Sequence, residues 1–95
     1  MPVRKNTPEA IKVRERFIRS FEELRYRGLV KTKLEFSKNV GLGTASNMNR
    51  MEKEQREPSI SNILLLHEKY SVSIEWIMLG KGEFFTEPTV SLLAQ

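Results

Sequence analysis

Residues 32–53 read TKLEFSKNVGLGTASNMNRMEK, and this stretch contains two start signals for short helices with glycines between them. Thr32 and Glu35 have the spacing of a capping box, in which a hydroxyl and a carboxylate satisfy each other's backbone amides at a helix start. Thr44 can cap a second helix. Gly41 permits a sharp turn after the first one. The stretch therefore predicts two short helices joined by a tight turn.

The second of these helices has two chemically different faces. At about 100° per residue, Met48 and Met51 lie on one face together with Thr44. The opposite face, with Ala45 at its edge, carries the polar and cationic side chains Ser46, Asn49, Arg50 and Lys53. The pattern predicts a helix whose apolar side packs inward and whose outer side is polar and basic.

Three further start signals lie outside this stretch. Thr7-Pro8-Glu9 opens a long helix over about residues 8–27, which ends near Gly28. Its apolar side chains recur at helical spacing: Val13, Phe17, Phe21 and Leu24. Pro58-Ser59 opens a fourth helix through Ile60, Ile63, Leu64 and His67, and Ser73 opens a fifth through Ile74, Ile77 and Met78 to Gly80.

No alternating strand pattern of comparable length occurs, and 95 residues suffice for one small core. We therefore predict a compact all-α fold of five helices, organised as a single domain over residues 1–95 with the paired short helices at about 31–53. Residues 86–95 are expected to form a flexible tail or, through Val90, Leu92 and Leu93, a dimerising one.

Several conspicuous side chains have an ordinary structural interpretation. Met48, Met51 and Met78 are expected to fill the core, and His67 is expected to be half-buried on the apolar side of its helix. Trp76 and the pair Phe84-Phe85 are expected to close the core or to form part of a dimer interface. The five arginines of the first helix spread around it, so we expect surface charges or partners for neighbouring glutamates: Arg14, Arg16, Arg19, Arg25 and Arg27.

The amino-acid composition lacks the residue types that most catalytic and metal-binding sites require. The chain has no cysteine, no aspartate and a single histidine, so a nucleophile with its base, or a set of metal ligands, lacks its parts. We expect no enzyme, no cofactor and no metal. The longest apolar runs have four residues, far below the roughly 20 that a membrane helix needs, and we expect a cytoplasmic protein.

The charge is unevenly distributed. Residues 1–56 hold 14 lysines and arginines against seven glutamates, whereas residues 57–95 hold two against five. A basic half attracts nucleic-acid phosphates or anionic lipid headgroups, and the alternative is a solvated face with no partner.

The order and spacing of several pieces resemble the phage-repressor-like (XRE, Cro/CI-type) helix-turn-helix family over residues 14–85. The pieces are TKLEFSKNVGL for the second helix and turn, SNMNRME for the recognition helix, EPSISNILLLHEKYSVS for the fourth helix and IEWIMLGKGEFF for the close. The resemblance implies a five-helix DNA-binding domain in which the third helix enters the major groove. It also implies one half of a homodimer on a palindromic operator in double-stranded DNA.

The sequence departs from the family pattern at three places. One extra residue, which we place at Gly43, stands between Gly41 and Met48. Ala45 occupies a position where some members read adenine with glutamine, and Glu54 stands where a helix-ending glycine is common. The family's base preferences are therefore not transferable.

If the third helix lies in the groove, the residues placed to meet base edges are Ala45, Ser46, Asn49 and Arg50. Arginine can pair with guanine and asparagine with adenine. The residues placed to meet phosphates are Thr32, Lys33, Thr44, Lys53 and Arg56. Thr44 is equally well explained as a plain helix cap, and the outer face of the helix as a solvated surface.

These observations together favour a sequence-specific DNA-binding transcriptional regulator, a repressor that occludes a promoter and is associated with the nucleoid. The alternative is a protein-interaction module on the same fold, antitoxin-like or otherwise partner-binding. A membrane-surface role for the first helix is disfavoured, because its arginines ring the helix instead of gathering opposite the apolar face.

Overall fold

Each helix within residues 7–86 of this protein begins at a side-chain hydroxyl that accepts a hydrogen bond from a backbone amide three residues later. The hydroxyl-to-amide distances lie between 3.0 and 3.3 Å at the five caps, Thr7, Thr32, Thr44, Ser59 and Ser73. Since the first amides of a helix have no partner within the helix, these caps fix where each helix starts. All five predicted start signals are confirmed.

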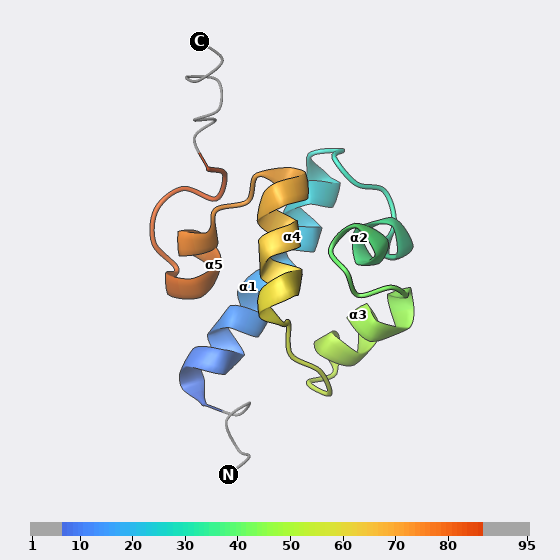
Figure 1. Cartoon of the computed structure of the whole chain (residues 1–95), viewed down its shortest axis with the longest axis horizontal. Coiled ribbons are helices and arrows are strands. Elements are labelled where there is room, and N and C mark those ends of the chain that lie inside the picture. Colours follow the sequence, from blue (N-terminus) through green and yellow to red (C-terminus); the bar gives the residue numbers. More distant parts are fainter. Residues whose placement is uncertain (1–6, 87–95) are drawn as a thin grey trace.

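The computed structural model describes residues 7–86 of the chain, and this part is all-α with no strand. The residues of the expected tail beyond Thr86 lie outside the described range. Figure 1 shows α4 in the middle, with α2 and α3 on one side and α5 on the other. The helices are α1 (Pro8–Tyr26), α2 (Lys33–Asn39), α3 (Ala45–Glu52), α4 (Ile60–Tyr70) and α5 (Ile74–Leu79).

The capping box predicted at Thr32 forms only in part. The Thr32 hydroxyl accepts from the amide of Glu35, but the Glu35 carboxylate accepts from the amide of Lys31, one residue before the cap, at 3.0 Å. A fully reciprocal box forms instead at the start of α4, between Ser59 and Asn62. An asparagine amide oxygen thus fills the role that a glutamate usually has.

All five helices contribute to one core. Phe36 of α2 is fully buried, with ring centroids 5.8 Å from Phe17, 5.1 Å from Phe21 and 6.0 Å from Tyr70. The predicted core positions of α1 and α3 are confirmed, since Met48 and the other residues named for these helices are buried or packed against the core. His67 is half-buried, as expected, with Nδ1 at 3.0 Å from the carbonyl oxygen of Val72.

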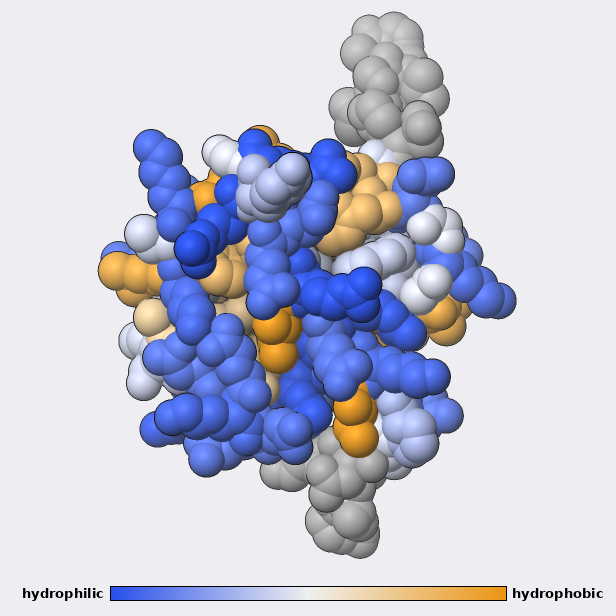
Figure 2. All heavy atoms as spheres, turned by 180° about the vertical axis from the view of Figure 1, so that it is seen from behind, coloured by the Kyte–Doolittle hydropathy of each residue, from blue (hydrophilic) through white to orange (hydrophobic). Residues whose placement is uncertain are grey.

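The prediction that Met78 fills the core is wrong, and two apolar side chains of α4 also lie outside the core. Ile60, Leu64 and Met78 are exposed, at 69%, 51% and 41%. The core side of α4 is formed by Asn62, Ile63 and Leu66, so the helix is turned away from the face that its apolar residues suggested. Figure 2 shows the side of the molecule opposite to that of Figure 1, where separate apolar patches lie among hydrophilic side chains.

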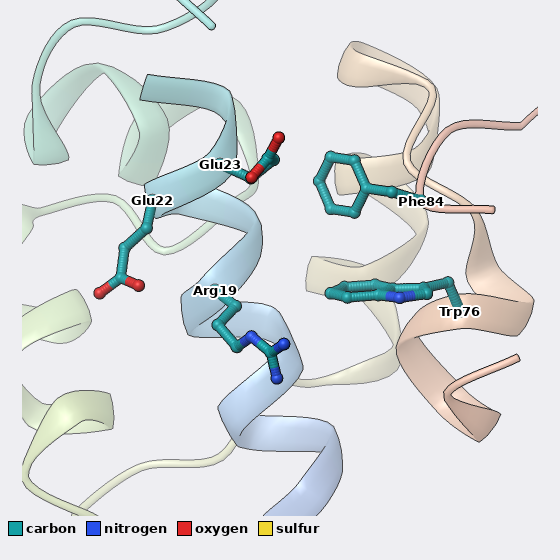
Figure 3. Close-up of a pocket in the computed structure, with 5 residues that line it drawn as sticks. All are labelled: Arg19, Glu22, Glu23, Trp76 and Phe84. Carbon is teal, nitrogen blue, oxygen red and sulfur yellow. The ribbon is translucent and has the colours of Figure 1, made fainter. Parts of the chain in front are cut away.

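Aromatic side chains close the core beside α5. The Trp76 and Phe84 rings meet edge to face at 4.9 Å, and the backbone of Phe84 accepts a hydrogen bond from Ser73 at 2.7 Å. The prediction that these aromatics close the core is confirmed. Arg19, Glu22 and Glu23 of α1 line a groove of about 400 Å³ together with the two rings, and Glu23 points toward Phe84 (Figure 3).

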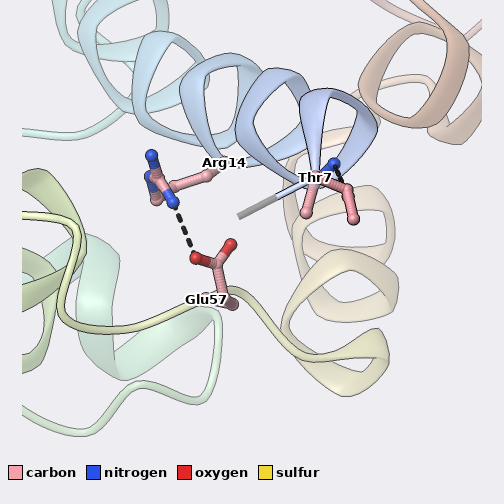
Figure 4. Close-up of polar contacts among 4 residues, drawn as sticks. Thr7, Arg14 and Glu57 are labelled. Carbon is pink, nitrogen blue, oxygen red and sulfur yellow. Dashed lines mark hydrogen bonds and ion pairs between the residues drawn. The ribbon is translucent and has the colours of Figure 1, made fainter. Parts of the chain in front are cut away.

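The prediction that Arg14 is a surface charge is wrong. Its side chain is 5% exposed, and Nη1 lies 2.6 Å from Oε2 of Glu57 (Figure 4). Glu57 is 25% exposed and belongs to the linker between α3 and α4, so this partly buried ion pair joins α1 to the segment that follows α3. The first-helix pair between Arg27 and Glu23, also at 2.6 Å, is exposed and matches the expectation.

Replacement of Glu54 by glycine is expected to raise the free energy of unfolding by about 0.5–1 kcal/mol. Glu54 has a φ of 64°, a left-handed conformation that a side chain disfavours, and it follows α3 where glycine is common in the family that the sequence resembles. Urea denaturation followed by circular dichroism measures the change. The matched control is Gln55→Gly, which is expected to destabilise, because Gln55 is not at positive φ. Destabilisation by both variants would contradict the prediction.

Candidate functional site

The turn between α2 and α3 contains two glycines in the left-handed conformation. Gly41 has a φ of 81° and Gly43 a φ of 86°. The amides of Leu42 and Gly43 both donate to the carbonyl oxygen of Ser37, at 2.8 and 3.1 Å, which folds the chain back against the end of α2. The residue inserted relative to the family pattern, placed at Gly43, therefore lies at a position where its backbone conformation favours glycine.

Two asparagine side chains hold this turn in place. Asn62 of α4 is buried, and its Nδ2 donates to the carbonyl oxygen of Val40 at 2.8 Å. Asn47 of α3 donates from Nδ2 to the carbonyl oxygen of Leu42 at 2.7 Å. Since these donors come from α4 and α3, they fix the direction in which α3 leaves the turn.

The outer face of α3 is polar, as the sequence predicted. Met48 and Met51 have no exposed surface, whereas Ser46, Asn49 and Arg50 are exposed. Ala45, at the edge of this face, is half-buried. On the side of the molecule drawn in Figure 2, the side chains over α3 are hydrophilic. Three of the four expected base-reading side chains are thus directed to solvent.

A lysine of α2 contacts this outer face of α3. The Nζ of Lys33 lies 2.8 Å from Oδ1 of Asn49 and 2.8 Å from Oε1 of Glu52. The structure therefore brings together a residue expected to meet phosphate and one expected to meet a base. Glu52 was missed by the sequence analysis. The available signal was its spacing of three from Asn49, which places both side chains on neighbouring positions of one helix.

The other residues expected to meet phosphate lie around this face. Thr32 and Thr44 are exposed helix caps, and Lys53 is the exposed residue at the C-terminal end of α3. Arg56 is half-buried, and its Nε is shielded from solvent without a hydrogen-bond partner among residues 7–86. Residues 31–56 hold six lysines and arginines against three glutamates, so the segment around the turn is basic.

The described residues contain neither a candidate metal site nor a membrane-spanning helix. Within residues 7–86 no three histidine or glutamate side chains lie close enough to hold a metal ion. In the same part of the chain, every helix is too short or too polar to span a membrane. The groove between α1 and α5, which the sequence analysis did not single out, combines charges of both signs with two aromatic rings.

Comparisons of the chain with protein-family models, with curated proteins and with solved structures give no match. The geometry and chemistry of α2, the turn and α3 are therefore the basis on which a function can be inferred.

Proposed function

We propose that this protein is a sequence-specific DNA-binding transcriptional regulator that places α3 in the major groove. The observation that carries the proposal is the division of α3 into two faces. Met48 and Met51 anchor it in the core, while Ser46, Asn49 and Arg50 stand exposed on the other side. A short helix held this way presents hydrogen-bonding side chains to base edges without large apolar groups.

The arrangement of α2, turn and α3 supports a helix-turn-helix of the phage-repressor-like kind. In that motif the first helix crosses the phosphate backbone and the second reads the groove. Thr32 and Lys33 stand at the start of α2, and Lys53 stands at the end of α3, where they can meet phosphates on either side. These contacts set the position on DNA, and the α3 side chains set the sequence.

We further propose that the protein acts as a homodimer on a palindromic operator. It would repress transcription by occluding a promoter, as a cytoplasmic protein associated with the nucleoid. Two-fold protein symmetry matches the symmetry of a palindrome. Met78 and Leu79 are exposed neighbours on α5, and they offer apolar surface to a second copy.

Selection from random duplexes of about 30 base pairs, long enough for two half-sites one helical turn apart, tests the proposal. An inverted repeat is the expected product, and its affinity should fall steeply with salt, because bound phosphates release counterions. Arg50→Ala is expected to weaken binding to the selected site by roughly 10–100-fold, since it removes a bidentate base contact. The control is Arg19→Ala, which changes an exposed arginine in the protein's own groove between α1 and α5. Because it removes no base contact, the affinity should stay within about twofold of that of the unchanged chain. Equal losses in both variants would contradict the placement of α3.

A second candidate function is a protein-interaction module, antitoxin-like or otherwise partner-binding. It is favoured by exposed apolar side chains that do not belong to α3, with Tyr26 87%, Leu29 52% and Ile60 69% exposed. This function predicts that the same selection yields no enriched duplex and that affinity for DNA has no salt dependence.

A further inference from the structure

The contact between Lys33 and Asn49 fixes the orientation of the Asn49 carboxamide. A lysine ammonium has only hydrogen-bond donors, so the atom that it approaches at 2.8 Å must be the carbonyl oxygen Oδ1. The Nδ2 amide consequently points away from Lys33, and within residues 7–86 it donates to no protein acceptor. Asn49 therefore presents donor hydrogens to a ligand that approaches α3.

The ammonium of Lys33 is itself only partly used. Two of its three hydrogens go to Asn49 and Glu52, each at 2.8 Å. The third remains for a ligand. Lys33 and Asn49 thus form one unit, in which the unused hydrogens on Nζ and on Nδ2 are all donors.

Base edges in the major groove differ in how they match such a unit. Guanine presents two acceptors, N7 and O6, whereas adenine presents the acceptor N7 beside the donor amino group N6. The usual pairing of asparagine with adenine needs Oδ1 to accept from N6. Oδ1 of Asn49 keeps a second lone pair, but an N6 amino group that approached it would also face the ammonium donors of Lys33, whereas the acceptors of guanine would not. The two acceptors of guanine, N7 and O6, match the donors on Lys33 and Asn49.

Glu52 determines where the ammonium stands. Its Oε1 lies 2.8 Å from Nζ, and the two side chains are about equally exposed, at 32% for Lys33 and 33% for Glu52. A free lysine on a flexible stem would move to the nearest phosphate. The carboxylate holds it over α3 instead, so Glu52 is a positioning residue.

We propose that Lys33 and Asn49 read guanine jointly in the major groove, with Glu52 positioning the lysine. The inference depends on the proposed DNA-binding function and names the base that this part of the site prefers. It replaces two expectations, that Asn49 pairs with adenine and that Lys33 contacts a phosphate.

Duplex selection with four proteins tests the inference: the unchanged chain, Lys33→Met, Glu52→Gln and the control Lys38→Met. The unchanged chain should enrich guanine at one position of each half-site. Lys33→Met frees Oδ1 of Asn49 and should shift that position toward adenine, changing the guanine-to-adenine ratio by roughly tenfold. Glu52→Gln should shift it in the same direction by a smaller factor. Lys38→Met, a change of an exposed lysine of α2 outside the unit, should leave the preference unchanged.

Each other outcome contradicts a defined part of the argument. Uniform loss of affinity in Lys33→Met, with the base preference intact, would make Lys33 a plain phosphate contact and overturn the inference alone. Adenine at that position in the sites selected by the unchanged chain would do the same. Failure of the unchanged chain to enrich any duplex would overturn the proposed function as well. Thermal melting by circular dichroism, expected to be similar for all four proteins, excludes misfolding as the cause.

Discussion

Replacement of Glu57 by alanine is expected to lower the free energy of unfolding by about 3 kcal/mol. The change leaves the Arg14 guanidinium, whose side chain is 5% exposed, without its charged partner 2.6 Å away. Removing one member of a buried ion pair costs more than the pair contributes, because the remaining charge stays desolvated. Urea denaturation at neutral pH measures the loss.

Two matched variants identify the cause. Arg27→Ala breaks the exposed pair with Glu23 and is expected to cost at most about 1 kcal/mol, since solvent screens that pair. The double replacement of Arg14 and Glu57 by methionine is expected to recover most of the stability lost in Glu57→Ala, because no charge remains buried. A double variant as unstable as the single one would show that the ion pair is not the reason.

Replacement of Asn62 by alanine is expected to cost a similar amount, about 3 kcal/mol, by leaving two backbone groups unpaired. Asn62 is 3% exposed. Its Nδ2 donates to the carbonyl oxygen of Val40, and its Oδ1 accepts from the amide of Ser59 at 2.9 Å. Without the hydrogen bond to Val40, the turn before α3 is held less firmly. The affinity for the selected duplex should therefore fall together with the stability.

Asn62→Asp separates the two contacts. The carboxylate keeps an acceptor for the Ser59 amide but has no donor for Val40, so most of the destabilisation should remain. Asn39→Ala, which removes a half-buried hydrogen bond to the Tyr70 hydroxyl, is the control and is expected to cost about 1 kcal/mol. Full stability in Asn62→Asp would indicate that the bond to Val40 contributes nothing.

The helix starts and the turn were predictable because their causes are local. A cap satisfies an amide three residues away, as Thr7, Thr44 and Ser59 do, and its signal therefore lies within one helical turn of sequence. Gly41 and Gly43 adopt positive φ, which few other residues tolerate, so their positions also indicate the turn directly. The two faces of α3 followed from periodicity alone, because its buried side is marked by only two apolar residues.

The buried faces of α4 and α5 were not predictable in the same way. Ile60, Ile63, Leu64, Leu65 and Leu66 surround most of α4, so several rotations of that helix would bury a similar apolar area. The buried hydrogen bond from Asn62 to Val40 can form in only one of these orientations of α4, and in that orientation Ile60 and Leu64 are exposed to solvent. A polar side chain in the core face is a feature that apolar periodicity does not count.

Local sequence is sufficient to predict the all-α class, the five helix starts, the tight turn and the polar outer face of α3, since each depends on residues within about one or two helical turns. Which polar groups meet depends on how the helices pack against one another. Arg14 and Glu57 are 43 positions apart, Asn62 and Val40 22, and Lys33 and Asn49 16. Such pairs form when packing brings distant elements together, and burial then makes each hydrogen bond or charge specific for one partner. The unit of Lys33 and Asn49 is such a pair, so the base that we expect the protein to prefer also depends on the tertiary structure.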